Sequence, residues 1–182
     1  MKTTFKYSLE GQESERLIFR KLVETDFENW LEFCKDDESV KYISLLSNLK
    51  EPIERCNAWF ERVFNRYQNG LGGMNVLIDK NTNEFIGQCG LLIHTVDGME
   101  ELEIGYSIMP NHRQKGYASE AAKKCKDFAF ENDYANSLVS IIDVRNHLSA
   151  KVAINNGMKL DKQTLYNNTD VYIFRITNLK LS

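Results

Sequence analysis

The chain has 182 residues, 42% of them hydrophobic and 27% charged, with a net charge of −3, which is typical of one soluble globular domain. Its 23 basic and 26 acidic residues are mixed along the chain, so composition indicates neither a nucleic-acid-binding face nor attachment to an anionic membrane. The first residues lack the apolar run of a signal peptide, and no stretch approaches the roughly 18 apolar residues of a membrane helix. We therefore expect one cytoplasmic domain over residues 1–182.

The N-terminal part predicts one strand followed by two helices. Residues 16–22 are typical of a strand, and Thr25 offers a hydroxyl N-cap for a helix that reaches about Cys34. The acidic run 36–38 is interpreted as a solvated loop. Pro52 stands at the first turn of the second helix, which Gly70 ends. Its apolar face is predicted from helical spacing to consist of Ile53, Cys56, Phe60, Val63, Phe64 and Tyr67.

The rest of the chain alternates predicted strands with two further helices. The helices are expected from about Ala118 to Ala129 and from about Leu148 to Asn155, where Gly157 follows. Strands are expected over 72–78, 85–95, 102–108, 137–144, 158–166 and 171–177, the last two joined by a turn at 167–169. A strand-helix-strand crossover makes neighbouring strands parallel, so the order predicts an α/β (α+β) fold with a mixed sheet of about seven strands and about four flanking helices.

The four cysteines are widely spaced and form no C-x-x-C pair. Three of them fall in apolar patterns, where a reduced and buried thiol is the common case. We therefore expect neither a disulfide framework nor a metal site. The cysteines are Cys34, Cys56, Cys89 and Cys125.

The most informative segment, residues 104–121, is predicted as a strand, a short basic loop and the start of a helix. The first N–H groups of a helix have no intrahelical partner and attract anions, so a loop that admits a diphosphate there makes a phosphate site. Gly116 permits the close approach and Ala118 keeps the next position small, while Arg113 and Lys115 add positive charge. Taken alone, the pattern R-x-x-G-x-A also fits a solvated basic loop.

In context, the segment resembles the acetyl-CoA-binding core of the GNAT N-acetyltransferases. The resembling blocks are residues 14–22, 103–106, 113–121 and 143–158. The first block is similar to the opening of the RimJ/RimL-like branch, which acetylates ribosomal-protein N-termini. A dinucleotide-binding G-x-G-x-x-G motif is absent, which argues against a Rossmann domain. The resemblance implies a sheet that splays beside the strand before the basic loop, with acetyl-CoA as cosubstrate, an amine acceptor and no metal.

The resemblance also implies which residues hold acetyl-CoA. The pantetheine arm is expected to pair with the strand backbone, with the N–H of Ile108 facing the thioester oxygen. The expected cofactor-binding residues are Tyr106, Ser107, Ile108, Arg113, Gln114, Lys115, Gly116, Tyr117, Ala118, Ser119 and Asn146. Asn146 and Ser149 also fit an N-cap pair at the start of the last helix, which is compatible with a binding role.

Acetyl transfer to an amine requires a base, a stabilised oxyanion and a proton for the departing thiolate. Glu103, beside the expected thioester, is our first candidate base, with Glu101 and His94 as alternatives; an outward-facing carboxylate on a half-exposed strand explains Glu103 equally well. The tyrosine acid of many GNAT enzymes aligns with Ala153, so the hydroxyl of Ser149 becomes the candidate proton donor to coenzyme A. Met158 replaces the usual phenylalanine, which we interpret as packing only.

The acceptor is predicted to be the α-amine of a peptide or protein N-terminus ahead of a small amine such as a polyamine or an aminoglycoside. An α-amine with a pKa of about 7.7 to 8.0 needs a weaker base than a lysine near 10.4. The missing tyrosine leaves open a non-catalytic acyl-CoA-binding or regulatory domain. The first two helices and the loops 44–51 and 96–100 are expected to shape the acceptor pocket. Trp30 and Trp59 are expected to be exposed and available for a homodimer contact.

Overall fold

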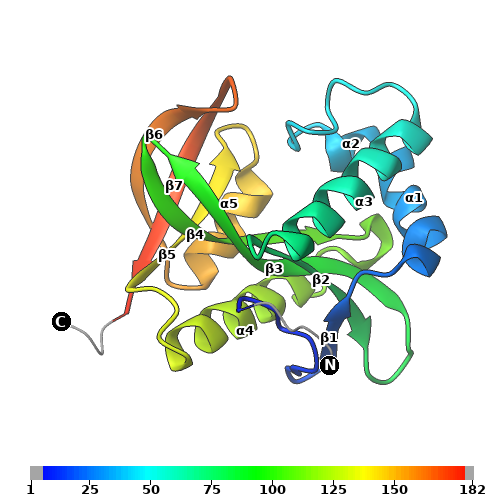
Figure 1. Ribbon diagram of the computed structural model, residues 1–182, viewed down its shortest axis with the longest axis horizontal. Coiled ribbons are helices and arrows are strands. Elements are labelled where there is room, and N and C mark those ends of the chain that lie inside the picture. Colours follow the sequence, from blue (N-terminus) through cyan, green and yellow to red (C-terminus); the bar gives the residue numbers. More distant parts are fainter. Residues whose placement is uncertain (1–5, 179–182) are drawn as a thin grey trace.

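The computed structural model describes residues 6–178, which form a seven-stranded mixed sheet with helices on both faces, as the α/β prediction required (Figure 1). The strands are β1 Leu17–Lys21, β2 Gly72–Asp79, β3 Phe85–Val96, β4 Met99–Ile108, β5 Ser137–Asp143, β6 Lys159–Tyr166 and β7 Thr169–Thr177. The helices are α1 Phe27–Lys35, α2 Asp37–Val40, α3 Pro52–Gln68, α4 Tyr117–Glu131 and α5 His147–Asn155, with 3₁₀ turns at Glu24–Asp26 and Pro110–His112.

The strand order across the sheet is β1-β2-β3-β4-β5-β7-β6. Neighbouring strands are antiparallel except for β4 and β5, which are parallel because α4 connects them as a crossover. The hairpin between β6 and β7 turns through Asn167 and Asn168, which both adopt the left-handed conformation with φ of 48° and 60°. The predicted crossover and the predicted asparagine turn are both confirmed.

The described residues form three buried hydrophobic clusters, and the two larger ones lie on opposite faces of the sheet. On one face, α4 and α5 pack on β3, β4 and β5, with Leu91, Ile104, Cys125 and Ala153 among the buried side chains. On the other face, α1 and α3 cover the β2 half of the sheet, and the buried side chains there are mainly aromatic and aliphatic (Figure 1). The face that carries α1 and α3 is therefore uncovered by helices toward β5, β7 and β6.

Several local predictions are wrong, each for a tertiary reason. Trp30 and Trp59 are 0% and 8% exposed, because α1 and α3 pack together through these rings, whose centroids are 5.1 Å apart. They are therefore buried in the core and are not available as an exposed homodimer contact. Ile53, predicted on the apolar face of α3, is 58% exposed, since the first turn of that helix extends beyond the sheet.

The start of α1 also differs from the prediction. The chain turns at Glu24–Asp26, before α1 begins, because the Asp26 carboxylate accepts a hydrogen bond from the N–H of Val23 at 3.0 Å and is held by Arg20 at 2.7 Å. Thr25 is therefore not the N-cap. The acidic run 36–38 is not a plain loop, since α2 begins at Asp37.

All four cysteines are buried, including the one that fell outside an apolar pattern. The Sγ atoms of Cys89 and Cys125 lie 3.5 Å apart between β3 and α4. Burial raises the pKa of the Cys125 thiol, and the hydrogen bond with Cys89 raises it further. These side chains therefore behave as small apolar residues of the core. Over the described residues, no helix is long and apolar enough to cross a membrane.

Candidate functional site

The parallel strands β4 and β5 are paired over a very short stretch and then diverge. Within residues 6–178 they pair at one register position, Glu103 with Val139, and the Ser140 hydroxyl then donates to the carbonyl of Ile104 at 2.9 Å. The N–H and C=O groups of one strand residue point to the same side, and the side alternates from one residue to the next. The N–H of Met109 donates to the carbonyl of Ile86 on β3. The polar backbone groups of Tyr106 and Ile108 therefore point away from β3, toward the region where β5 diverges.

The loop after β4 turns sharply before α4 begins. Gln114 and Gly116 both adopt the left-handed conformation, with φ of 61° and 83°. Gly116 is the N-cap residue of α4, and no side chain caps this helix. The first N–H groups of α4, those of Tyr117, Ala118 and Ser119, therefore face the loop without a side-chain acceptor. An uncapped helix N-terminus of this kind favours an anionic group.

Arg16 braces this loop from β1, a role that the sequence analysis did not assign to it. Its Nε pairs with Glu120 at 2.7 Å, its Nη1 donates to the carbonyl of Lys115 at 3.0 Å, and its guanidinium lies 4.2 Å from the ring centroid of Tyr117. The Tyr117 hydroxyl donates to Asp79 at 2.8 Å. Strands β1 and β2 therefore fix the position of the first turn of α4.

The basic residues of the loop differ in how they are held. The Arg113 Nε donates to the carbonyl of Ile108 at 3.1 Å, and its other nitrogens contact the Ser39 hydroxyl and, at 3.6 Å, the Asp36 carboxylate. This guanidinium therefore ties the end of β4 to the α1–α2 region. Gln114 and Lys115 are exposed, so the Lys115 ammonium is free to approach a phosphate group.

The first turn of α5 borders the same region. The side chain of Asn146 accepts a hydrogen bond from the N–H of Ser149 at 3.1 Å, which confirms the predicted capping pair. The Tyr106 hydroxyl donates to the carbonyl of Ser149 at 2.8 Å, linking α5 to β4. Burial raises the pKa of Tyr106, so this phenol stays protonated. Ser149 is consequently held beside residues 106–108 of β4, whose backbone groups face the region where β5 diverges.

Glu103 lies in a buried chain of three polar side chains. Its Oε2 is 2.9 Å from the His94 Nε2, and the His94 Nδ1 is 2.7 Å from the Tyr166 hydroxyl. The Glu103 and His94 side chains are 15% and 8% exposed, so the alternative of an outward-facing, half-exposed carboxylate is wrong. The sequence analysis considered His94 only by itself and did not name Tyr166, because the three residues come from β4, β3 and β6.

The charges around Glu103 set its ionisation. Burial by itself would raise the pKa of Glu103, but the positive field of His94, its hydrogen bond, the N–H of Ile141 at 3.3 Å and the charge of Arg66 lower it overall. Burial raises the pKa of Tyr166, and the negative charge of Glu103 adds to that shift. Glu103 is therefore ionised and Tyr166 protonated near neutral pH.

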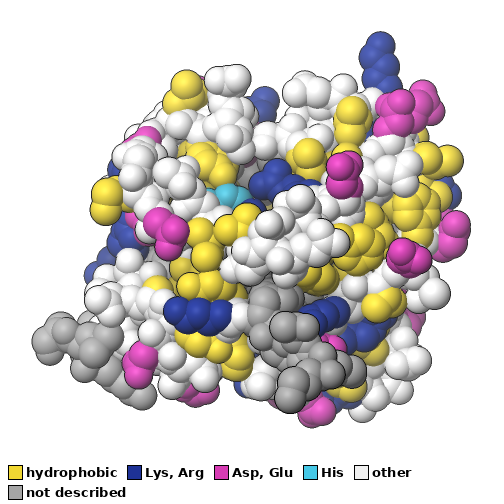
Figure 2. Space-filling model, in the orientation of Figure 1, with side chains coloured by type: hydrophobic (Ala, Val, Ile, Leu, Met, Phe, Trp, Pro, Cys, Tyr) yellow, Lys and Arg dark blue, Asp and Glu magenta, His cyan; other side chains and the backbone are white. Residues whose placement is uncertain are grey.

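Most other charged groups in this region are already paired. Arg175 binds Glu101 through two hydrogen bonds of 2.7 and 3.0 Å, and Arg145 binds Asp143 through two of 2.6 and 2.9 Å. Tyr42 reaches across from the segment after α2 to the carbonyl of Arg145 at 3.4 Å. In Figure 2 a histidine and basic side chains show at the centre of this face, between the α3 side and the β6–β7 side.

Two surface cavities do not include the residues proposed for the site, although the first is lined in part by Glu101, which neighbours Glu103 on β4. One, of about 200 Å³, is lined by residues that include Tyr7, Ile93 and Tyr134, and the other, of about 540 Å³, by residues that include Leu22 and Phe64. Neither lining contains Glu103, Ser149 or the loop after β4. We place the candidate site at the divergence of β4 and β5, because the ionisable side chains, the open backbone and the uncapped helix converge there.

Comparisons with known proteins agree on one family. The profile described as "Acetyltransferase (GNAT) domain" matches residues 16–159. The uncharacterized protein YkkB of Bacillus subtilis is 33% identical over 128 residues, which cover 70% of this chain and 72% of that protein.

Two solved structures share the fold at low identity. RimL, a ribosomal L7/L12 α-N-protein acetyltransferase solved with coenzyme A, aligns with a TM-score of 0.73 and 16% identity, covering 92% of this chain and 97% of RimL. Spermidine N-acetyltransferase of Vibrio cholerae, solved with coenzyme A and spermine, aligns with a TM-score of 0.69 and 18% identity, covering 89% and 95%. At these identities the likeness shows the fold alone.

Proposed function

This chain belongs to the acetyltransferase (GNAT) family and is an acetyl-CoA-dependent N-acetyltransferase, and we propose that it acetylates the α-amine of a peptide or protein N-terminus. The proposal places the protein in the RimJ/RimL-like branch. It follows from how the cosubstrate and the acceptor fit the region where β4 and β5 diverge.

The residues of this region fit acetyl-CoA. The uncapped N–H groups of Tyr117 to Ser119, next to the left-handed Gly116, suit a diphosphate, and Lys115 adds a positive charge beside them. The backbone of Tyr106 to Ile108 suits the pantetheine arm, with Asn146 bordering the same path. Arg113 and Gln114 contribute by shaping the loop. These residues are the proposed acetyl-CoA site.

The chemical step needs only groups that border the thioester end of this path. The N–H of Ile108 points to the side on which the thioester oxygen would lie, so it would stabilise the tetrahedral oxyanion. Ser149, fixed by Asn146 and Tyr106, is the proposed proton donor to the departing thiolate. Glu103 is the proposed carboxylate of the base system, since it is ionised and lies at the point where β4 and β5 separate.

The single observation that favours an α-amine over a polycation is the pairing of the carboxylates around this region. Glu103, Glu101 and Asp143 each carry a cationic or histidine partner within 3.0 Å. A polyamine or an aminoglycoside would need unpaired carboxylates, and here it would compete with fixed guanidinium groups. An α-amine, with its pKa of about 7.7 to 8.0, is partly neutral at physiological pH and needs one modest base.

The test is release of free coenzyme A from acetyl-CoA with a panel of acceptors at fixed protein concentration. We expect a kcat/KM for Ala- or Ser-initiated peptides at least tenfold above those for spermidine and an aminoglycoside. N-terminally blocked versions of the same peptides that retain an internal lysine are the matched control, and these should give little turnover.

Three results would contradict the proposal in different ways. A preference for spermidine or the aminoglycoside would reverse the acceptor assignment. Equal turnover of blocked and free peptides would point to a lysine acceptor. Thermal stabilisation by acetyl-CoA without thiol release for any amine would favour the non-catalytic acyl-CoA-binding alternative, which the alanine at position 153 keeps open.

A further inference from the structure

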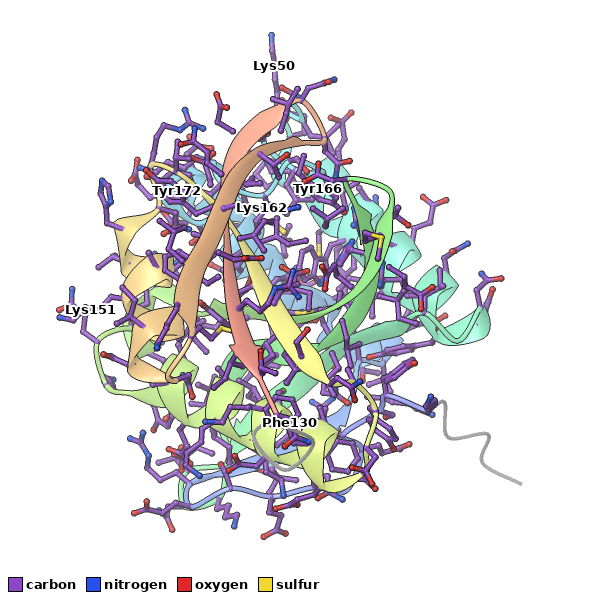
Figure 3. All side chains as sticks on the ribbon, turned by 90° about the vertical axis from the view of Figure 1, so that its left-hand side faces the viewer. Lys50, Phe130, Lys151, Lys162, Tyr166 and Tyr172 are labelled. Carbon is purple, nitrogen blue, oxygen red and sulfur yellow. The ribbon has the colours of Figure 1, made fainter. Side chains whose placement is uncertain are left out.

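Glu103, His94 and Tyr166 form a continuous hydrogen-bonded chain from three strands that are distant in sequence. The chain runs from Glu103 Oε2 to His94 Nε2 at 2.9 Å and from His94 Nδ1 to the Tyr166 hydroxyl at 2.7 Å. Figure 3 shows Tyr166 at the end of β6, beside the β3–β4 hairpin that carries the other two residues. Both ring nitrogens of His94 are therefore engaged.

The partners of His94 determine which of its nitrogens carries the proton. An ionised carboxylate only accepts hydrogen bonds, so Glu103 requires the His94 proton on Nε2. The Nδ1 of the neutral ring must then accept from the hydroxyl of Tyr166. This leaves the oxygen lone pairs of Tyr166, whose side chain is half-buried, as the outer end of the chain.

From this geometry we propose that Tyr166 and His94 relay the proton that the acceptor amine loses. Glu103 does not touch the amine; it orients His94 and stabilises the positive charge that forms on it. The inference deepens the proposed function and rests on it. As the amine nitrogen bonds to the thioester carbon, its proton passes to the Tyr166 oxygen while the Tyr166 proton passes to His94 Nδ1. The resulting imidazolium is stabilised by the Glu103 carboxylate, and it later returns a proton to solvent through Tyr166.

The thiol side of the reaction balances separately. Collapse of the tetrahedral intermediate breaks the carbon–sulfur bond, and the thiolate takes a proton from the Ser149 hydroxyl, which solvent reprotonates. No oxidant, metal or further reactant is needed. The amine loses one proton to the relay, and the sulfur gains one from Ser149.

Charged groups of both signs surround the chain of Glu103, His94 and Tyr166. Arg62 and Arg66 from α3 add positive charge near Tyr166, and Arg66 also acts on Glu103. Glu101, the register partner of His94 on β4, is neutralised by Arg175 of β7. The chain is thus surrounded by charges of both signs from α3, β4 and β7.

The alternative, in which Glu103 takes the proton directly, makes a different prediction for the pH profile. In that case His94 only lowers the pKa of Glu103, so removing His94 would raise the carboxylate pKa and shift the inflection of kcat/KM upward. In the relay, removing His94 removes the enzyme's inflection and leaves only that of the acceptor amine, whose pKa is found by titrating the free peptide. The two mechanisms are therefore separated by the same variant.

The experiment measures kcat/KM against pH for the full chain, with a free N-terminal peptide as acceptor, in wild type, H94Q, Y166F, E103Q and Y172F. Tyr172 is the matched control, since it lies on the same hairpin with its ring against Phe174 in the core that α4 and α5 cover. We expect H94Q to lose the enzyme's inflection, to keep that of the acceptor amine and to lose at least about 100-fold in kcat/KM. Y166F should lose at least tenfold, and Y172F less than about twofold.

E103Q should keep the inflection and move it to lower pH, because the imidazolium loses its counter-charge. The ¹⁵N resonances of His94 in the wild type should report the Nε2–H form, and E103Q should weaken that preference. An H94Q protein that keeps a second inflection beside that of the acceptor amine, or a Y166F protein indistinguishable from Y172F, would overturn the relay alone. A wild type that turns over no amine would overturn the proposed function and, with it, the relay.

Discussion

Replacement of Gly116 by glutamate should abolish acetyl-CoA binding while the fold persists. Gly116 has φ of 83°, so any side chain there is strained, by about 1 to 3 kcal/mol. In a protein of this size, each kcal/mol lowers Tm by roughly 2 to 4 °C. A Cβ built at this position would lie 3.3 Å from Arg16 Nη2, a flexible side-chain end that can move.

The added carboxylate acts on the ligand rather than on the fold. At about 5 Å and an effective dielectric constant of about 20, each like-charge pair costs roughly 3 kcal/mol, or more than 100-fold in affinity. Gly116→Ala is the matched control, since it carries the same backbone strain without the charge. Gly98→Ala, at another left-handed glycine with open space around it, reports strain away from the site.

Isothermal titration with acetyl-CoA and thermal melts measure the two effects separately. We expect G116A and G116E to melt within a few degrees of each other, and only G116E to lose measurable binding. Wild-type affinity in a folded G116E protein would refute the assignment of the diphosphate to the N-terminus of α4. Equal loss of affinity in G116A and G116E would attribute the effect to strain alone.

Ser149→Ala should lower kcat by about 10² to 10⁴ with little change in the Kd for acetyl-CoA; an unchanged kcat in a folded variant would remove Ser149 as the acid. Tyr106→Phe removes the hydrogen bond to the Ser149 carbonyl and should cost about 1 to 3 kcal/mol in the free energy of unfolding, together with a lower kcat; chemical denaturation and steady-state kinetics check both, and wild-type values for both would contradict the link. Burial by itself would raise the pKa of Glu120, but bonds from Ser14 and from the backbone and side chain of Arg16 lower it overall. Its contribution to stability is therefore present above the unfolded pKa of about 4.3 and is lost as pH falls through the lower folded value. Denaturation between pH 3 and 6 should show a smaller pH slope for Glu120→Gln than for wild type, and equal slopes would contradict this.

Much of the site was predictable because its parts are local in sequence. Gly116 follows a strand and precedes an amphipathic helix, and that order alone predicts a loop whose helix N-terminus is open. Asn146 and Ser149 are three residues apart, which is the spacing of a cap, and the cap is present. The burial of the core face of α3 likewise follows from helical periodicity, apart from Ile53 at its exposed first turn.

The errors and omissions share one physical cause, which is contact between segments distant in sequence. Trp30 and Trp59 were expected to be exposed because neither helix pattern reports the other helix that covers it. The contacts of the Arg113 guanidinium with Ser39 and Asp36 from the α1–α2 region were not predicted, because those residues are more than 70 positions away in the sequence. The bracing of the loop by Arg16 likewise depends on strand β1 lying next to the start of α4.

The sequence by itself determined the order of elements, the parallel crossover through α4 and the open N-terminus after Gly116, because these follow from periodicity, turn chemistry and the handedness of strand-helix-strand units. Only the tertiary structure decided the environment of Glu103. Strand pairing sets His94 on β3 beside Glu103 on β4, and the β6–β7 hairpin then carries Tyr166 to the other ring nitrogen. Ionisation and proton transfer depend on distances of about 3 Å, and no spacing along a chain specifies such distances between residues from three different strands.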